Sequence, residues 1–276
     1  MELETESISA EEYHDLPGVS NSMLKDYIDD FRLYHFKYIS GRYKKKAKAH
    51  FDFGSAVHEI ALLGSQANIV VIPKDVLSKS GSRAGGKWEE FEASNPKKLL
   101  LKQDDFDAVM RCVDAIYADK TAGELMQASG VCEKYFKADL PELKMQARCR
   151  PDKLIQTQSK NIVVDLKTTQ QTKPESFVWT VRDFGYANQE YFYRKVLAEN
   201  GIEVDAFIFI AVSVTEPHTV DCYTLHESWQ AIAAEEVEEN LSSLARRMIE
   251  NDWKPEPGCK RLLPPSSLTR EKEYQV

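Results

Sequence analysis

The run at residues 206–214 (AFIFIAVSV) is the feature that most constrains the fold. Almost every position in it is apolar, and Phe, Ile and Val dominate, which is typical of a strand buried inside a sheet. A second apolar run, Ile162-Val163-Val164, lies in residues 161–167, and two helical segments (174–184 and 187–200) separate the two runs. This order of strand, helices and strand predicts an α/β fold, in which a mixed central sheet is flanked by helices on both sides.

The remaining pattern adds elements around this centre. Helical spacing predicts one helix that begins near Ser20 or Ser22 and ends at Gly41. The other expected elements are helices at residues 53–63, 104–118 and 227–250, a strand at 69–73, a hairpin of 131–140 with 143–150, and a strand at 218–225.

The length of 276 residues suits one large domain, which we place at residues 13–257. Residues 1–12 read as an acidic flexible tail and residues 258–276 as an irregular, Pro-rich tail. No apolar run approaches the roughly 20 residues of a membrane span. The acidic N-terminus has no signal-peptide pattern, so we expect a cytoplasmic protein without a membrane partner.

The net charge of −8 does not exclude nucleic acid, because its distribution is uneven. Residues 1–15 hold six acids and no Lys or Arg, which leaves 36 bases against 38 acids in the rest of the chain. The chain after residue 15 is therefore nearly neutral, and its basic residues can still gather in one DNA-binding groove. The candidate DNA contacts are Arg42, Lys44, Lys45, Lys46 and Lys48, then Arg83 and Lys87 in a Gly/Ser-rich segment at 78–87 that we expect to be mobile, and Ser20 and Ser22.

Each of these DNA contacts has an ordinary alternative. The bases bind phosphate irrespective of sequence, but a solvated loop explains any one of them nearly as well. Ser20 and Ser22 at a helix N-terminus can receive a terminal phosphate, and simple capping explains them equally.

The five cysteines, Cys112, Cys132, Cys149, Cys222 and Cys259, are odd in number and widely spaced, and no two form a C-x-x-C pair. This spacing argues against a zinc site, a disulfide framework and an iron–sulfur cluster.

Asp152, Asp165 and Lys167 form the strongest candidate for an active site. Each carboxylate lies at or near the end of a predicted strand, and the two lie thirteen residues apart. Converging carboxylates suit a hard cation such as Mg²⁺. Residues two apart on a strand share a face, which would place the Lys167 ammonium beside the metal, and the Leu166 carbonyl could be a further ligand. Such a site can hydrolyse a phosphodiester.

The tripeptide alone is not distinctive. The pattern [Asp/Glu]-x-Lys also occurs at Glu142-Leu143-Lys144 and at Asp252-Trp253-Lys254. What separates Asp165 from these decoys is its place at the end of an apolar strand, soon after Pro151-Asp152.

Four further residues are candidates for the same pocket. His58, four residues after Gly54 on a predicted helix, could bind metal or phosphate, although such a histidine is more often a core residue. Gln189 and Tyr193 share a helix face and could hydrogen-bond the attacking water, whereas packing alone also explains Tyr193. Glu133 is either a further metal ligand or a charge on the face of its strand.

In this order the motifs resemble PD-(D/E)xK nucleases of the RecB and lambda-exonuclease type, and most closely the RecE-type exonucleases. The resemblance covers roughly residues 13–257. Its motifs are Tyr13-His14-x-x-Pro17-Gly18-Val19-Ser20-x-Ser22-x-Leu24, Gly54-x-x-x-His58, Cys149-Arg150-Pro151-Asp152-Lys153, Asp165-Leu166-Lys167-Thr168-Thr169, Gln189-x-x-x-Tyr193 and Trp253-x-Pro255.

The resemblance implies a restriction-endonuclease-like core and Mg²⁺-dependent digestion of linear double-stranded DNA, with Mn²⁺ as a substitute. It implies 5′→3′ polarity, a 3′ single strand for a RecT-type annealing protein, a ring-like homo-oligomer (trimer or tetramer), and a bacterial or phage origin. His58, Asp152, Asp165 and Lys167 match the family's catalytic positions, Gln189 and Tyr193 match its fourth motif, and Glu133 matches less securely.

Two other functions stay open. One is a RecB-like or CRISPR-adaptation nuclease acting on single strands, and its frequent four-cysteine cluster is not supplied by the cysteine spacing here. The other is a catalytically inactive DNA-binding module, which a missing carboxylate or lysine would favour.

Overall fold

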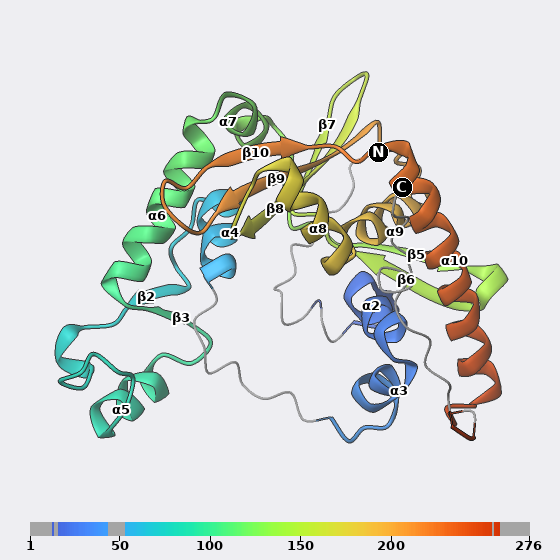
Figure 1. The fold of residues 1–276 in the computed structure, drawn as a ribbon, viewed down its shortest axis with the longest axis horizontal. Helices are drawn as coiled ribbons and strands as arrows, with labels where there is room; N and C mark the ends of the chain where they lie inside the picture. The colour runs from blue at the N-terminus through green and yellow to red at the C-terminus, as the bar shows by residue number, and fades with distance from the viewer. Residues whose placement is uncertain (1–12, 14–15, 44–52, 256, 260–276) are drawn as a thin grey trace, which may run out of the picture.

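A five-stranded mixed sheet forms the centre of the computed structural model, which describes residue 13 and residues 16–43, 53–255 and 257–259 (Figure 1). Its strand order is β10-β9-β8-β7-β4, in which β8 and β9 are parallel and the other neighbours are antiparallel. The strands are β4 (Val131–Cys132), β7 (Lys153–Gln156), β8 (Asn161–Thr169), β9 (Ala206–Ser213) and β10 (Val220–Tyr223).

Helices cover both faces of this sheet, because side chains of β8 and β9 alternate between two apolar clusters. Val163 and Phe207 pack towards α8, α9 and α10, whereas Val164 and Ile210 pack towards α4, α6 and α7. The helices are α4 (Phe53–Leu63), α6 (Gln103–Ala118), α7 (Lys120–Gln127), α8 (Pro174–Phe184), α9 (Tyr186–Ala198) and α10 (Glu227–Glu250). The predicted α/β core with helices on both sides is confirmed.

Two smaller sheets flank the central one. The first has the order β1-β6-β5 and lies on the side of α9 and α10, and the second pairs β2 with β3 beside α5 (Figure 1). Their elements are β1 (Val19–Ser20), β5 (Phe136–Leu140), the 3₁₀ turn η3 (Pro141–Leu143) and β6 (Met145–Cys149), then β2 (Ile69–Val71), the 3₁₀ turn η2 (Lys74–Val76), α5 (Gly86–Ser94) and β3 (Leu99–Leu101).

The predicted single strand at residues 131–140 was wrong, because the chain changes sheet at Glu133. That residue has a φ of 55°, in the left-handed region, so the pleat cannot continue through it. β4 pairs with β7 in the central sheet, whereas β5 pairs with β6. The strand β7, which lies between Asp152 and β8, was not predicted from the sequence.

The predicted single helix up to Gly41 is interrupted at Asp30. Asp30 has extended backbone, and its carboxylate accepts a hydrogen bond from the Arg32 amide, so it ends one helix and caps the next. Tyr38, whose helical spacing from Leu24 and Phe31 would place it on their inner face in one continuous helix, is 40% exposed. The resulting elements are α2 (Asn21–Asp29), α3 (Phe31–Tyr34) and a π-helical turn, η1 (His35–Ile39).

The Gly/Ser-rich segment at residues 78–87 is tied down by local hydrogen bonds. The hydroxyl of Ser78 contacts those of Ser80 and Ser82 at 2.9 and 2.6 Å, and the segment leads into α5 at Gly86. Among the described residues, no helix combines the length and the apolar character that crossing a membrane requires.

Candidate active site

Asp165 and Lys167 lie next to each other on β8, on the face of the central sheet that α9 covers. Alternation along the strand turns the Leu166 side chain to the opposite, fully buried face. The Lys167 ammonium forms an ion pair with Asp165 Oδ1. The Asp165 side chain is only 2% exposed, so this pair is screened from bulk water.

Gln189 on α9 joins the two members of this pair. Its Nε2 donates to Asp165 Oδ2 at 2.6 Å, and its Oε1 accepts from Lys167 Nζ at 2.9 Å. A primary amide is the side chain that can serve a carboxylate and an ammonium at once. The three side chains therefore form one closed polar cluster.

Asp152 reaches this cluster from the link between β6 and β7. Its Oδ2 accepts a hydrogen bond from the Leu166 amide at 2.7 Å, which fixes the carboxylate beside β8. His58 on α4 lies on its other side, with 3.4 Å between His58 Nδ1 and Asp152 Oδ2. Asp152 directly precedes β7, and the antiparallel pairing of Lys153 with Val164 on β8 brings Asp152 opposite Asp165.

Glu133 completes a group of metal-type donors with His58 and Asp152. One ligand atom from each of the three lies within 4.8 Å of the other two. The left-handed conformation at Glu133 turns the chain there, and its amide donates to the Asp152 carbonyl at 3.0 Å. Asp165 is not one of these three residues, and its two oxygens contact Lys167 and Gln189.

Arg150 is a neighbour of the site to which the sequence assigned no role. Its guanidinium contacts Glu133 Oε2 at 2.7 Å and lies 5.2 Å from the centre of the Tyr13 ring. The motif Cys149-Arg150-Pro151-Asp152 indicates that Arg150 lies near the site, because Asp152 is two residues away. Nothing in this motif indicates that the partner of Arg150 is Glu133, nineteen positions before Asp152.

Two of the carboxyl groups have raised pKa values. Burial raises the pKa of Glu133 to about 7, the Asp152 charge adds to it, and Arg150 and His58 oppose it. Burial likewise raises the pKa of Asp165 to about 6, against the lowering effect of Lys167, and Asp152 raises it further. Acids of like charge that crowd in a buried place favour protonation or a cation.

Lys167 keeps its proton. Burial alone would lower its pKa, but the charges of Asp165 and Asp152 outweigh that effect and raise the pKa above the ordinary value. Its Nζ also lies 4.5 Å from the centre of the Tyr186 ring, an aromatic contact that the sequence did not indicate. Lys167 is therefore a charged donor at neutral pH and not a base.

Tyr193 follows Gln189 by one helical turn and packs near Phe207, with 6.2 Å between ring centres. Burial raises the pKa of its phenol well above 10, and Tyr13 and Asp165 add to the shift. The phenol is therefore neutral. Packing and donation from a neutral hydroxyl are both compatible with this place.

The expected DNA contacts are dispersed. Ser20 is buried and caps α2, because its hydroxyl accepts a hydrogen bond from the Met23 amide at 3.4 Å. The Ser22 hydroxyl lies 3.0 Å from the Ser20 hydroxyl.

The basic candidates lie elsewhere. Arg83 donates to the Leu100 carbonyl at 3.0 Å, and Lys87 lies 3.8 Å from an Asp75 oxygen, so both bases have contacts within the small β2–β3 unit. Arg42 is exposed, and Lys44, Lys45, Lys46 and Lys48 lie outside the described residues.

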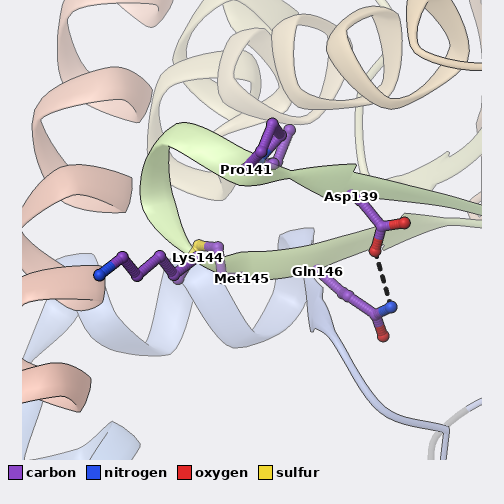
Figure 2. A pocket seen from close by; sticks show the side chains of 6 residues that line it. Asp139, Pro141, Lys144, Met145 and Gln146 are labelled. Carbon is purple, nitrogen blue, oxygen red and sulfur yellow. Dashed lines mark hydrogen bonds between the residues drawn. The ribbon is translucent and has the colours of Figure 1, made fainter.

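The two decoy tripeptides lie away from the cluster. Glu142-Leu143-Lys144 forms the turn of the β5–β6 hairpin, where a hollow of about 290 Å³ is lined by Lys144, Gln146 and neighbouring residues. Figure 2 shows Lys144 extending away from the hydrogen-bonded Asp139 and Gln146 side chains. The second decoy follows α10, and its Lys254 is exposed.

Comparison with solved structures supports the fold. A crystal structure titled "Putative exonuclease" from Eubacterium rectale matches with a TM-score of 0.62 and 16% identity, over 96% of this chain and 99% of that chain. A second structure, titled SSO0001, matches at 14% identity over 67% of this chain and 85% of that one, but its TM-score of 0.28 is too low to support an argument. No curated protein shows significant sequence similarity to this chain.

A family model described as "PDDEXK-like domain of unknown function (DUF3799)" matches residues 20–261. That span contains every candidate catalytic residue, from His58 to Tyr193, and nearly the whole described fold. The chain therefore belongs to the DUF3799 family of PDDEXK-like domains.

Proposed function

We propose that this protein is a divalent-metal-dependent exodeoxyribonuclease that digests linear double-stranded DNA. The observation that carries the proposal is the closed cluster of Asp165, Lys167 and Gln189 beside Asp152. It unites a buried carboxylate, a charged lysine and an amide at one point of the sheet, and these groups can bind a metal, offset phosphate charge and position both.

The donor set fits a hard cation such as Mg²⁺, with Mn²⁺ as a substitute. Asp152, Glu133 and His58 would hold the ion, because their ligand atoms already lie within 4.8 Å of one another. Asp165, whose pKa is raised in part by the charge of Asp152, and the Leu166 carbonyl would complete the set. When bound, such an ion supplies an activated water and neutralises charge on the phosphate.

The protein's own groups then have distinct roles. The Lys167 ammonium offsets the charge that develops on the scissile phosphate, since its raised pKa keeps it protonated. Gln189 is a positioning residue that fixes Lys167 and Asp165 relative to each other. Tyr193 presents a neutral phenol for hydrogen bonding near Asp165.

The exonuclease mode rests on resemblance. The motif order is similar to that of RecE-type exonucleases, and the solved neighbour with the same fold carries an exonuclease title. On this basis we propose 5′→3′ digestion within the cytoplasm, a ring-like trimer or tetramer, and delivery of the 3′ strand to a RecT-type annealing protein in a bacterial or phage recombination system.

A time course on linear duplex, labelled at the 5′ or the 3′ end, tests the proposal. With Mg²⁺ we expect label to be released early from one end only, and no release in EDTA. Covalently closed circles should stay intact in the same reaction. Efficient nicking of closed circles would refute the exonuclease mode, and the absence of cutting with Mg²⁺ or Mn²⁺ on any DNA would refute the nuclease.

A further inference from the structure

Phe184 ends α8 as an exposed aromatic residue next to the catalytic cluster. Its side chain is 57% exposed, although it belongs to a helix whose Phe177 and Val181 are buried in the core. An isolated exposed apolar side chain needs no explanation, but this one continues into the site.

A line of stacked rings connects Phe184 to the lysine of the cluster. The Phe184 and Tyr186 rings stack with 5.9 Å between centres and 29° between planes. The Lys167 ammonium lies 4.5 Å from the centre of the Tyr186 ring. One aromatic ring therefore separates the exposed Phe184 from the group that is to contact the scissile phosphate.

A second lysine, Lys25, lies next to the exposed end of this line of rings. Lys25 on α2 donates to the Phe184 carbonyl at 3.1 Å, and its Nζ lies 5.2 Å from the centre of the Phe184 ring. This contact joins α2 to the last residue of α8, whose end lies near α2 in Figure 1. The adjacent acid, Asp183, is engaged by Arg182 at 2.6 Å. Lys25 thus lies near the Phe184 ring, and Lys167 lies near the Tyr186 ring.

We propose that Phe184 stacks on an unpaired base of the DNA strand that enters the catalytic cluster. The proposal rests on the nuclease function above and deepens it. An exposed aromatic ring with a lysine close by suits single-stranded nucleic acid, since every base has a face that stacks and every phosphate carries charge. A base inside a duplex already stacks on both neighbours, so the ring selects a terminal or separated nucleotide. The substrate at the cut would then be one strand of an opened end.

Trp179 provides a matched control on the same helix. It is 56% exposed, and Arg182 lies 4.5 Å from its ring centre, so it also combines an open ring with a cation. It differs from Phe184 in its place along α8 and because, among the described residues, no ring stacks on it to lead to Lys167. Stacking near the cut therefore depends on Phe184 and not on Trp179.

The test measures binding of a single-stranded oligonucleotide by fluorescence anisotropy, with Ca²⁺ in place of Mg²⁺ and the oligonucleotide checked for integrity. We expect Phe184→Ala and Phe184→Leu to weaken binding about tenfold, or about 1.4 kcal/mol, which is in the range for one stacked base. Phe184→Trp should keep the affinity, and Trp179→Ala should match the wild type.

Oligonucleotides with one abasic position locate the base. If stacking is the cause, the Phe184→Ala effect disappears when the stacked base is missing and persists when another base is removed. A Phe184→Ala loss that is equal on every abasic oligonucleotide, or retained affinity in Phe184→Leu, would overturn the proposal and indicate packing or a protein partner.

Linear-duplex cutting by the same wild-type preparation separates the two claims. Cutting without any Phe184 effect refutes the stacking alone. Base-dependent binding through Phe184 without cutting refutes the nuclease and leaves the stacking. If neither occurs, both fail.

Discussion

Replacing Glu133 by Gln should reduce the number of protons released when the site takes up a divalent cation. Metal ligands must be deprotonated, and the apo-form pKa of Glu133 is about 7 because the group is buried near Asp152. The sign is that of a raised carboxyl pKa: the neutral acid is favoured below about 7, so metal affinity is full above that pH and is lost as pH falls through it.

The magnitude follows from that pKa. Glu133 is about half protonated at pH 7, about nine-tenths at pH 6 and about one-tenth at pH 8, so it should release those fractions of a proton per ion. It should also make binding about tenfold weaker at pH 6 than at pH 8. Asp165, with a pKa of about 6, should add about one-tenth of a proton at pH 7.

Isothermal titration of Mn²⁺ in buffers of different ionisation enthalpy measures this release. The wild type minus Glu133→Gln isolates the Glu133 contribution, about half a proton at pH 7. Glu190→Gln is the control, because Glu190 is also a buried acid with a raised pKa and an arginine partner, Arg194, yet it lies outside the metal-type group. Equal proton release by wild type and Glu133→Gln would refute Glu133 as a ligand.

Two further predictions concern the support of the site. Gln189→Met keeps the side-chain volume but removes both hydrogen bonds to charged groups, each worth about 1.5–3 kcal/mol. The rate of single-turnover cutting should therefore fall at least about tenfold, while the affinity for Mn²⁺ stays the same. An unchanged rate would contradict the positioning role of Gln189. Gly130→Ala should lower stability by about 1–3 kcal/mol in urea unfolding, because its Cβ would meet the rigid Leu154 carbonyl at 2.6 Å. Gly86→Ala, which meets nothing within 4 Å, should be neutral, and equal effects of the two would count against the packing argument.

Elements with a strong local pattern could be predicted from the sequence. Residues 53–63, 174–184 and 227–250 form helices over those ranges, since amphipathic spacing and Pro174 at a helix start are local signals. The apolar run of β9 is likewise a strand. Each of these elements is fixed by its own residues more than by distant partners.

Elements decided by tertiary contacts could not be predicted. β7 has only two apolar residues in a row, Leu154 and Ile155, and it exists because β8 and β4 pair with its two edges. The change of sheet at Glu133 depends on a left-handed backbone conformation. Sequence patterns predict that conformation mainly at glycine, and the residue here is a glutamate. Asp30 resembles many exposed acids, and only its capping contact reveals the helix break.

In the candidate site, too, local features could be predicted from the sequence, and contacts between distant segments could not. Asp165 and Lys167 were expected to be neighbours because strand periodicity is local, and they form an ion pair. The bridge by Gln189, the Arg150 contact to Glu133 and the ring of Tyr186 under Lys167 join segments far apart in the chain. Single-sequence patterns do not carry such pairings.

The most direct measurement of the central claim compares Lys167→Ala with Lys254→Ala in Mg²⁺-dependent digestion of linear duplex. Both variants remove the lysine of an Asp-x-Lys tripeptide, but only Lys167 lies in the cluster with Asp165 and Gln189. Lys167→Ala should lower the rate at least about 100-fold with folding intact by circular dichroism, whereas Lys254→Ala should match the wild type. Near-normal digestion by a folded Lys167→Ala protein, or equal losses in both variants, would contradict the proposed active site.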